Sequence, residues 1–176
     1  MLAFKYLVWD PTARLILSPT SPMVWTGGVA TAKCYGGQWF PTDGFGVPDK
    51  GQEPAYPEGA FESHQAPAEG CHCGIYAVGD FLLLHEYAHN SGLLDFLGSR
   101  LLFGLVEGFG KILEYEAGWR FEQARILAIA PPWDMARRWA YWAAAEAAEQ
   151  VGARYFKSAS TLNKAESWRH PDWVKY

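Results

Sequence analysis

The side chains with the greatest chemical potential in this chain are its cysteines and histidines. All three cysteines and four of the five histidines fall between Cys34 and His89. Thiolate sulfur and imidazole nitrogen are ligands that zinc prefers in proteins. The residues form two sets, and each set predicts a different function. One set comprises Cys34, His64, Cys71 and Cys73, and the other comprises His85 and His89 with Glu86 between them.

The first set has the composition of a structural zinc site, because Cys3His is a standard tetrahedral ligand combination. Cys71 and Cys73 are two positions apart, so in extended backbone their side chains share one side and His72 points away. Cys34 and His64 border a Gly- and Pro-rich segment that cannot form long helices. A metal ion would clamp this long loop. The alternative is three buried free thiols and an exposed histidine.

The second set lies on a segment that reads H-E-x-x-H-x-x-G-x-x-D from His85 to Asp95. Histidines four positions apart share one helix face and can bind one zinc ion. The segment resembles the zincin peptidases, specifically the metzincin-like branch whose third ligand is Asp. That resemblance implies His85, His89 and Asp95 as ligands and Glu86 as the general base. The alternative is a helix whose histidines mark its polar boundary.

The first part of the chain is predicted to be rich in strands and loops. Residues 1–17 alternate between apolar and polar positions, which predicts two strands joined by a turn at Asp10-Pro11-Thr12. Residues 18–22 read as a loop, and residues 26–70 as a long Gly- and Pro-rich loop. Residues 71–77 predict a short strand or a tight turn into a helix.

The predicted helix covers residues 78–97, with a stop signal at Asn90-Ser91-Gly92. Residues 100–129 predict β-structure, because glycines weaken a helical interpretation and apolar residues alternate. Alternation from Leu113 to Phe121 favours one continuous strand, whereas Ala117-Gly118 favours a hairpin.

A further helix is predicted from Met135 to Gln150, with Asp134 as N-cap and Gly152 after its end. Its face towards the sheet is predicted to comprise Trp139, Trp142, Ala143 and Ala147. Residues 157–176 read as a polar, aromatic-containing tail. Across the strand before this helix, Glu116, Arg120 and Glu122 form either an ion-pair row or a polar pocket, and the row is favoured.

The length predicts a single domain, and the predicted strands and helices make it an α+β domain over residues 1–156. The chain has 176 residues, a net charge of −4 and nine tryptophans. The negative charge excludes a general affinity for nucleic acid, and no apolar run is long enough to cross a bilayer. We interpret most tryptophans as core residues rather than as a stacking surface for bases or sugars. Three cysteines and no visible export signal predict a cytoplasmic protein with reduced thiols.

Over roughly residues 15–155 the chain resembles a family of small bacterial and phage proteins that is common in actinobacteria. The family's motifs include Ala-x-Cys, His-x-Ala-Pro, Cys-x-Cys-Gly-Ile-Tyr-Ala and Gly-Trp-Arg-x-Glu-x-Ala. The matching pieces are Trp25 with Ala32-Lys33-Cys34, His64-Gln65-Ala66-Pro67, Cys71 through Ala77, the glycines at 104, 108 and 110, Glu114 through Ala124, and the helix from Asp134 to Gln150.

This resemblance includes every member of the first set and omits the segment from His85 to Asp95. It implies structural Zn²⁺ at the first set and carries no established activity. We therefore expect a non-enzymatic, zinc-stabilised binding module related to phage biology, with a protein partner. The alternative remains a zinc metallopeptidase that uses the second set.

Overall fold

The structure is a computed structural model. It describes residues 1–19, 21–34, 64–69, 71, 73–92, 97, 100–116, 118–132 and 138–165. These residues form a β-rich α+β fold, in which helices pack against one eight-stranded sheet. This confirms the predicted fold class. None of the helices in these ranges is long and apolar enough to span a membrane.

The N-terminal strands follow the alternating pattern of the sequence. Strands β1 (Leu2–Asp10) and β2 (Leu15–Ser18) pair antiparallel. The Asp10 carboxylate accepts hydrogen bonds from the backbone N–H groups of Thr12 and Ala13, which confirms the predicted turn. Strands β3 (Ser21–Trp25) and β4 (Val29–Thr31) follow. The predicted loop over 18–22 is therefore wrong at both ends, because β2 extends to Ser18 and pairs with β3, which begins at Ser21.

The central strands form a long hairpin. Strand β6 (Leu101–Tyr115) pairs with β7 (Gly118–Ala130), and Tyr115 faces Gly118 across the turn. The hairpin interpretation of Ala117-Gly118 is thus correct, and the continuous strand is wrong. Strand β5 (Ile75–Val78) pairs with the start of β7 and with Phe4 of β1. The two-residue strand β8 (Arg154–Tyr155) runs parallel to β7.

Helix α1 (Phe81–Asn90) is shorter than the predicted helix over 78–97. The Asp80 side chain accepts a hydrogen bond from the Leu82 backbone N–H and caps its start. Its end coincides with the predicted stop, where Gly92 adopts a φ of 71° that a glycine tolerates without a steric penalty. Residues 93–96 lie outside the described residues.

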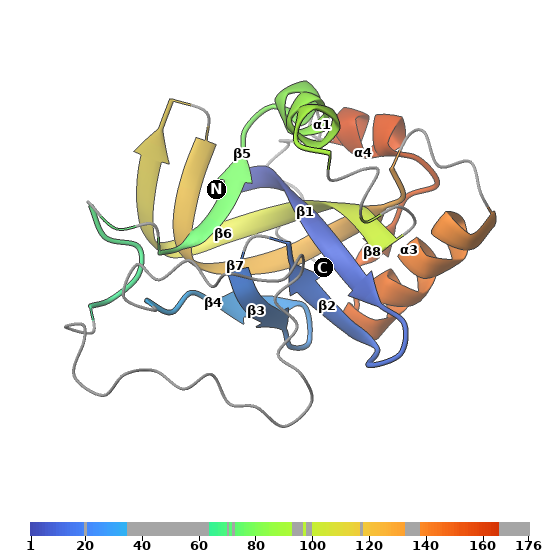
Figure 1. Cartoon of the computed structure of the whole chain (residues 1–176), viewed down its shortest axis with the longest axis horizontal. Coiled ribbons are helices and arrows are strands. Elements are labelled where there is room, and N and C mark those ends of the chain that lie inside the picture. Colours follow the sequence, from blue (N-terminus) through green and yellow to red (C-terminus); the bar gives the residue numbers. More distant parts are fainter. Residues whose placement is uncertain are drawn as a thin grey trace.

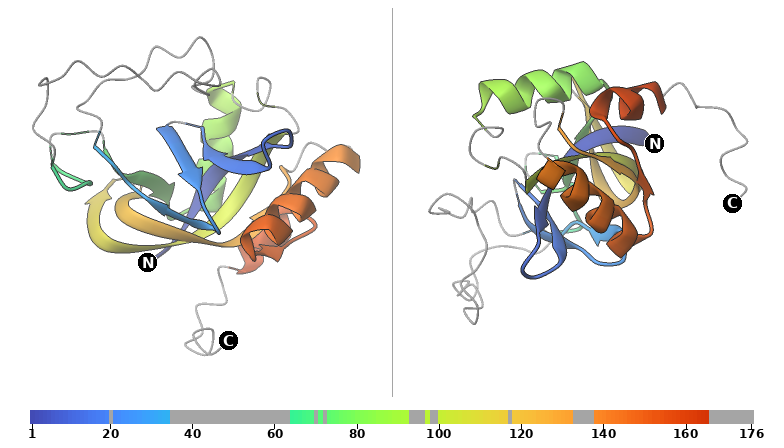
Figure 2. Two further views of the ribbon diagram at one scale, coloured as in Figure 1. Left: turned by 90° about the horizontal axis from the view of Figure 1, so that it is seen from below. Right: turned by 90° about the vertical axis from the view of Figure 1, so that its right-hand side faces the viewer.

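Two further helices follow the hairpin. Helix α3 (Arg138–Val151) ends just before Gly152, as predicted, while Asp134 lies outside the described residues. Helix α4 (Ala159–Ala165) falls within the predicted tail, and its Ala159 and Leu162 are fully buried. The views in Figures 1 and 2 place α1 and α4 side by side over one part of the sheet, with α3 beside another part.

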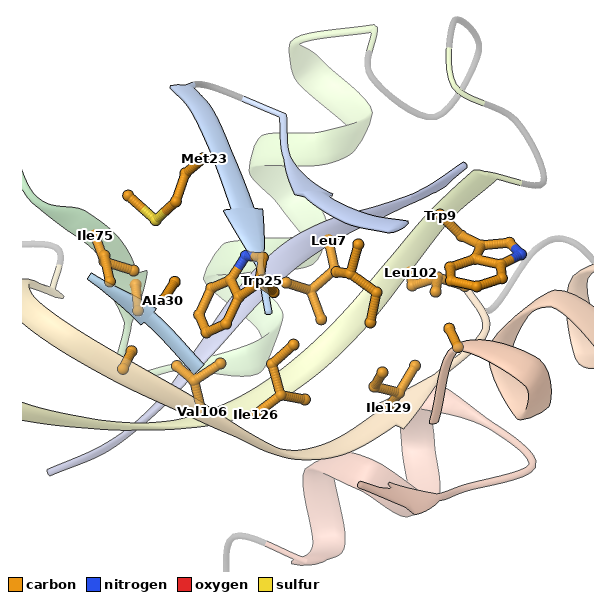
Figure 3. Packing of buried hydrophobic residues seen from close by; sticks show 14 of the residues in the cluster. Leu7, Trp9, Met23, Trp25, Ala30, Ile75, Leu102, Val106, Ile126 and Ile129 are labelled. Atoms are coloured by element: carbon orange, nitrogen blue, oxygen red, sulfur yellow. The ribbon is translucent and has the colours of Figure 1, made fainter. Parts of the chain in front are cut away.

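The sheet curls around the larger of two hydrophobic clusters. Both β5 and β6 pair with β1 and with β7, so these four strands form a closed ring of pairings. Figure 3 shows Leu7, Trp25, Val106 and Ile129 of this cluster between the strands. Side chains of α3 close it on one side. The second cluster lies between the sheet and helices α1 and α4.

The tryptophans divide between core and surface. Among the tryptophans that the structure describes, Trp9 and Trp25 are buried, whereas Trp139 and Trp142 are 45% and 52% exposed. The prediction that these two face the sheet from α3 is therefore wrong. The helix instead buries its alanines, and the small alanine side chains let α3 approach the sheet closely.

Candidate metal centre

Four side chains that are distant in sequence converge at one point. The ligand atoms of Cys34, His64, Cys71 and Cys73 all lie within 4.8 Å of one another, and they are the one group of three or more possible metal ligands within the described ranges. Cys34 follows β4, while the other three belong to the segment that leads into β5. The tertiary fold thus assembles the complete first set of the sequence.

The spacing of these atoms fits a tetrahedral ion. The sulfur atoms of Cys34 and Cys71 are 3.6 Å apart, and Nε2 of His64 is 3.2 Å from the sulfur of Cys73. A tetrahedron with Zn–S bonds of about 2.3 Å has edges of about 3.8 Å. A disulfide would require a sulfur–sulfur distance of about 2.05 Å, and no disulfide links these three cysteines within the described residues. The residues present therefore fit a metal ion that is bound by three cysteines and one histidine.

The backbone before β5 forms a tight loop that turns the two neighbouring cysteines towards the site. The N–H of Cys71 donates to the carbonyl of Ala68. Gly74 has a φ of 123°, and a Cβ there would lie 3.0 Å from the Cβ atoms of both Arg120 and Pro67. Only glycine combines that backbone conformation with such a close approach. The loop consequently rests directly on the side chain of Arg120.

Arg120 holds this loop through backbone carbonyls. Its Nη1 donates to the carbonyls of Cys71 and Cys73, the latter at 3.2 Å, and its Nη2 donates to the carbonyl of Ala68 at 3.4 Å. Although Arg120 is only 3% exposed, no carboxylate forms an ion pair with it among the residues that the structure describes. The predicted ion-pair row is therefore wrong.

Glu122 shows why the row does not form. Its carboxylate accepts hydrogen bonds from Nε2 of Gln65 at 2.7 Å and from the backbone N–H of Lys111 at 2.9 Å. These bonds lower the pKa of Glu122. The carboxylate thus stabilises the irregular part of β6 and the approach to His64, while Arg120 is left to the cysteine loop.

The thiols of the loop influence one another's ionisation. Burial raises the pKa of Cys71, but hydrogen bonds from Cys73, Cys34 and His64 together lower it to about 7. Burial raises the pKa of Cys73 to about 11, and the adjacent thiol of Cys71 adds to this rise. The negative charge of one thiolate therefore disfavours deprotonation of the neighbouring thiol. A divalent cation between the sulfur atoms would remove this repulsion.

The second set of residues lies on helix α1, away from this group. His85 is half-buried, and its ring stacks on Phe103 at 6.3 Å between centroids. Glu86 and His89 are exposed. The two histidines and Glu86 belong to no group of three possible ligands within the described ranges. Asp95, the third ligand implied by the peptidase resemblance, lies outside the described residues, as does His72.

The sequence did not point to Arg120 as a partner of the cysteine loop. Its guanidinium also lies 4.4 Å from the ring centre of Tyr115 and 5.5 Å from that of Tyr76. No local pattern marks Arg120 for this role. Tyr76 and Arg120 face each other only because β5 pairs with β7.

Comparison of the chain with known protein families, with curated proteins and with solved structures finds no match. The conclusions below therefore rest on the geometry of this chain.

Proposed function

We propose that the protein is a zinc-stabilised, non-enzymatic binding module. The observation that carries this proposal is the convergence of the ligand atoms of Cys34, His64, Cys71 and Cys73 within 4.8 Å. Four protein ligands complete a tetrahedral coordination shell and leave no position for a substrate or an activated water. A closed shell of this kind stabilises structure and does not perform catalysis.

The place of the site in the chain supports a structural role. The chain leaves the site at Cys34 and returns to it at His64, so one ion would fix both ends of the segment 35–63. Closing a long loop is a means of stabilising a fold by a cross-link. The module would bind a protein partner. Thiolate ligands also favour a reducing, cytoplasmic setting for the protein.

The proposal is tested by zinc content per chain, measured by elemental analysis of the purified protein. We expect one zinc ion in the wild type, its loss in Cys73→Ser, and its retention in His89→Ala and Glu86→Gln. Because Cys73 supplies a ligand atom and the α1 residues do not join the cluster, the variants separate the two sets. Retention of zinc in Cys73→Ser would overturn the proposal.

The same variants address the peptidase alternative. A peptidase that uses His85 and His89 would lose zinc in His89→Ala, and Glu86→Gln would keep zinc but abolish hydrolysis of unfolded casein. We expect neither effect. Loss of zinc confined to His89→Ala would replace the module by the peptidase.

A further inference from the structure

Arg120 is a buried positive charge that forms no ion pair with the described residues. A buried charge is costly unless it is paired with an opposite charge. Arg120 is 3% exposed, yet its hydrogen-bond acceptors are three neutral carbonyls. Its Nε atom is buried without a hydrogen-bond partner. The rings of Tyr115 and Tyr76 contribute cation–π attraction, which offsets part of the cost.

The candidate metal centre supplies the missing negative charge. Three thiolates and one neutral imidazole around a Zn²⁺ ion carry a net charge of −1. Arg120 donates hydrogen bonds to the backbone carbonyls of two of the three ligand cysteines, so its positive charge lies next to the ligands.

We infer that Arg120 is the positioning residue and counter-charge of the metal centre, an inference that rests on the proposed zinc site. Its planar guanidinium holds the carbonyls of Ala68, Cys71 and Cys73 so that the two sulfur atoms face Cys34 and His64. Its charge balances the loaded site. Metal binding and the pairing of β5 with β7 are consequently coupled through this one side chain.

A lysine cannot fully replace this arginine. The guanidinium is a rigid fork whose donors reach several acceptors, whereas an ammonium group is a point charge on a flexible stem. Gly74 lies against the Arg120 side chain, so the loop is shaped to this residue. Arg120→Lys therefore retains the charge but loses part of the positioning, and Arg120→Met loses both.

The test is the zinc affinity of the full-length protein, measured by competition with a chromophoric chelator. Outer-shell partners of metal ligands typically contribute about 10- to 100-fold to affinity. We expect Arg120→Met to weaken zinc binding by about that factor and Arg120→Lys to weaken it less. Arg125→Met is the matched control, because Arg125 lies on the same strand and pairs with Glu107 at an exposed position. It should bind zinc like the wild type.

The stability of the metal-free variants distinguishes positioning from a general structural role. An arginine that only supports the fold would lower the stability of the metal-free and metal-bound proteins equally and leave affinity unchanged. Equal affinity of Arg120→Met and Arg125→Met would therefore overturn the inference. If Arg120→Met does not fold, Arg120→Gln takes its place with the same expectation. A wild type without zinc would instead refute the proposed function.

Discussion

At the scale of single residues, identical side-chain types acquire different chemistry from their surroundings. His64 has a cysteine sulfur 3.2 Å from its Nε2, while His85 stacks on a phenylalanine ring. Both were candidate ligands from the sequence. What separates them is the set of neighbours that the fold provides, because a metal ion needs several donors at one point.

Lys5 is a second residue whose properties depend on its surroundings. It is buried in β1, and its Nζ donates to the carbonyl of Tyr76 at 2.9 Å. Burial lowers its pKa from 10.5 to about 8. Below pH 8 both the folded and the unfolded chain hold the proton, and the cost of burying the charge is constant. Between pH 8 and 10.5 only the unfolded chain holds it, so folding becomes more favourable as pH rises.

We therefore predict that this lysine adds to the pH dependence of stability. From pH 8 to 10.5 the wild type should gain about 3 kcal/mol in free energy of unfolding relative to Lys5→Met. Urea denaturation at a series of pH values measures the difference between the two curves. Lys157→Met, at an exposed position, should follow the wild type. Parallel curves for wild type and Lys5→Met would contradict the prediction.

At the scale of elements, helix α3 shows how a fold selects one face from an ambiguous sequence. It carries Trp139 and Trp142 near its start as well as several alanines, and large apolar residues are ordinarily the buried ones. Here the alanines are buried against the sheet, and Trp139 packs edge-on against Trp142 at the surface, with 5.5 Å between ring centres. Close packing of the helix against β7 requires small side chains at the contact.

Because α3 buries alanines and exposes tryptophans, we predict that substituting an alanine destabilises the protein more than substituting a tryptophan. Ala144→Leu should destabilise the protein by about 1–3 kcal/mol, because extra methylene groups do not fit a filled core. Trp142→Ser should change stability by about 0.5 kcal/mol or less, because the side chain is half exposed. Thermal or urea denaturation measures both. A larger loss in Trp142→Ser than in Ala144→Leu would show that the helix uses its other face.

At the scale of the whole molecule, the candidate centre connects two regions that the sheet alone leaves apart. Cys34 lies just beyond β4, and Cys71 and Cys73 lie just before β5, while β4 and β5 both pair with β7. A metal ion would therefore link the end of β4 to the start of β5, two strands that both pair with β7 and do not pair with each other within the described residues. The second cluster, under α1 and α4, is not part of this link.

Removal of the metal should accordingly lower the free energy of unfolding, while the hydrophobic core stays folded. A ligand at 100 times its dissociation constant contributes about 2.7 kcal/mol, which corresponds to about 5–10 °C in Tm for a domain of this size. We expect a zinc chelator to lower Tm by at least this amount and to expose the three thiols to a thiol reagent. An unchanged Tm in chelator would contradict a stabilising metal.

Much of the fold could be predicted from local patterns. The turn after Asp10, the stop at Gly92 and the end of α3 near Gly152 depend on residues adjacent in sequence, and the structure has each of them. The hairpin between β6 and β7 was one of two interpretations, since both alternation and a turn signal were present. The pairing of β6 with β7, which extends from Tyr115 and Gly118 beside the turn to Phe103 and Ala130 at the far end, decided between them.

The sequence by itself determined the fold class and a complete candidate ligand set, because ligand types and turn residues are local chemical properties. Only the tertiary structure decided that Cys34 reaches His64, Cys71 and Cys73, that Arg120 turns from Glu122 to the cysteine loop, and that α3 buries its alanines. These outcomes depend on which strands become neighbours. Long-range pairing brings distant side chains within bonding distance, and no local pattern encodes that distance.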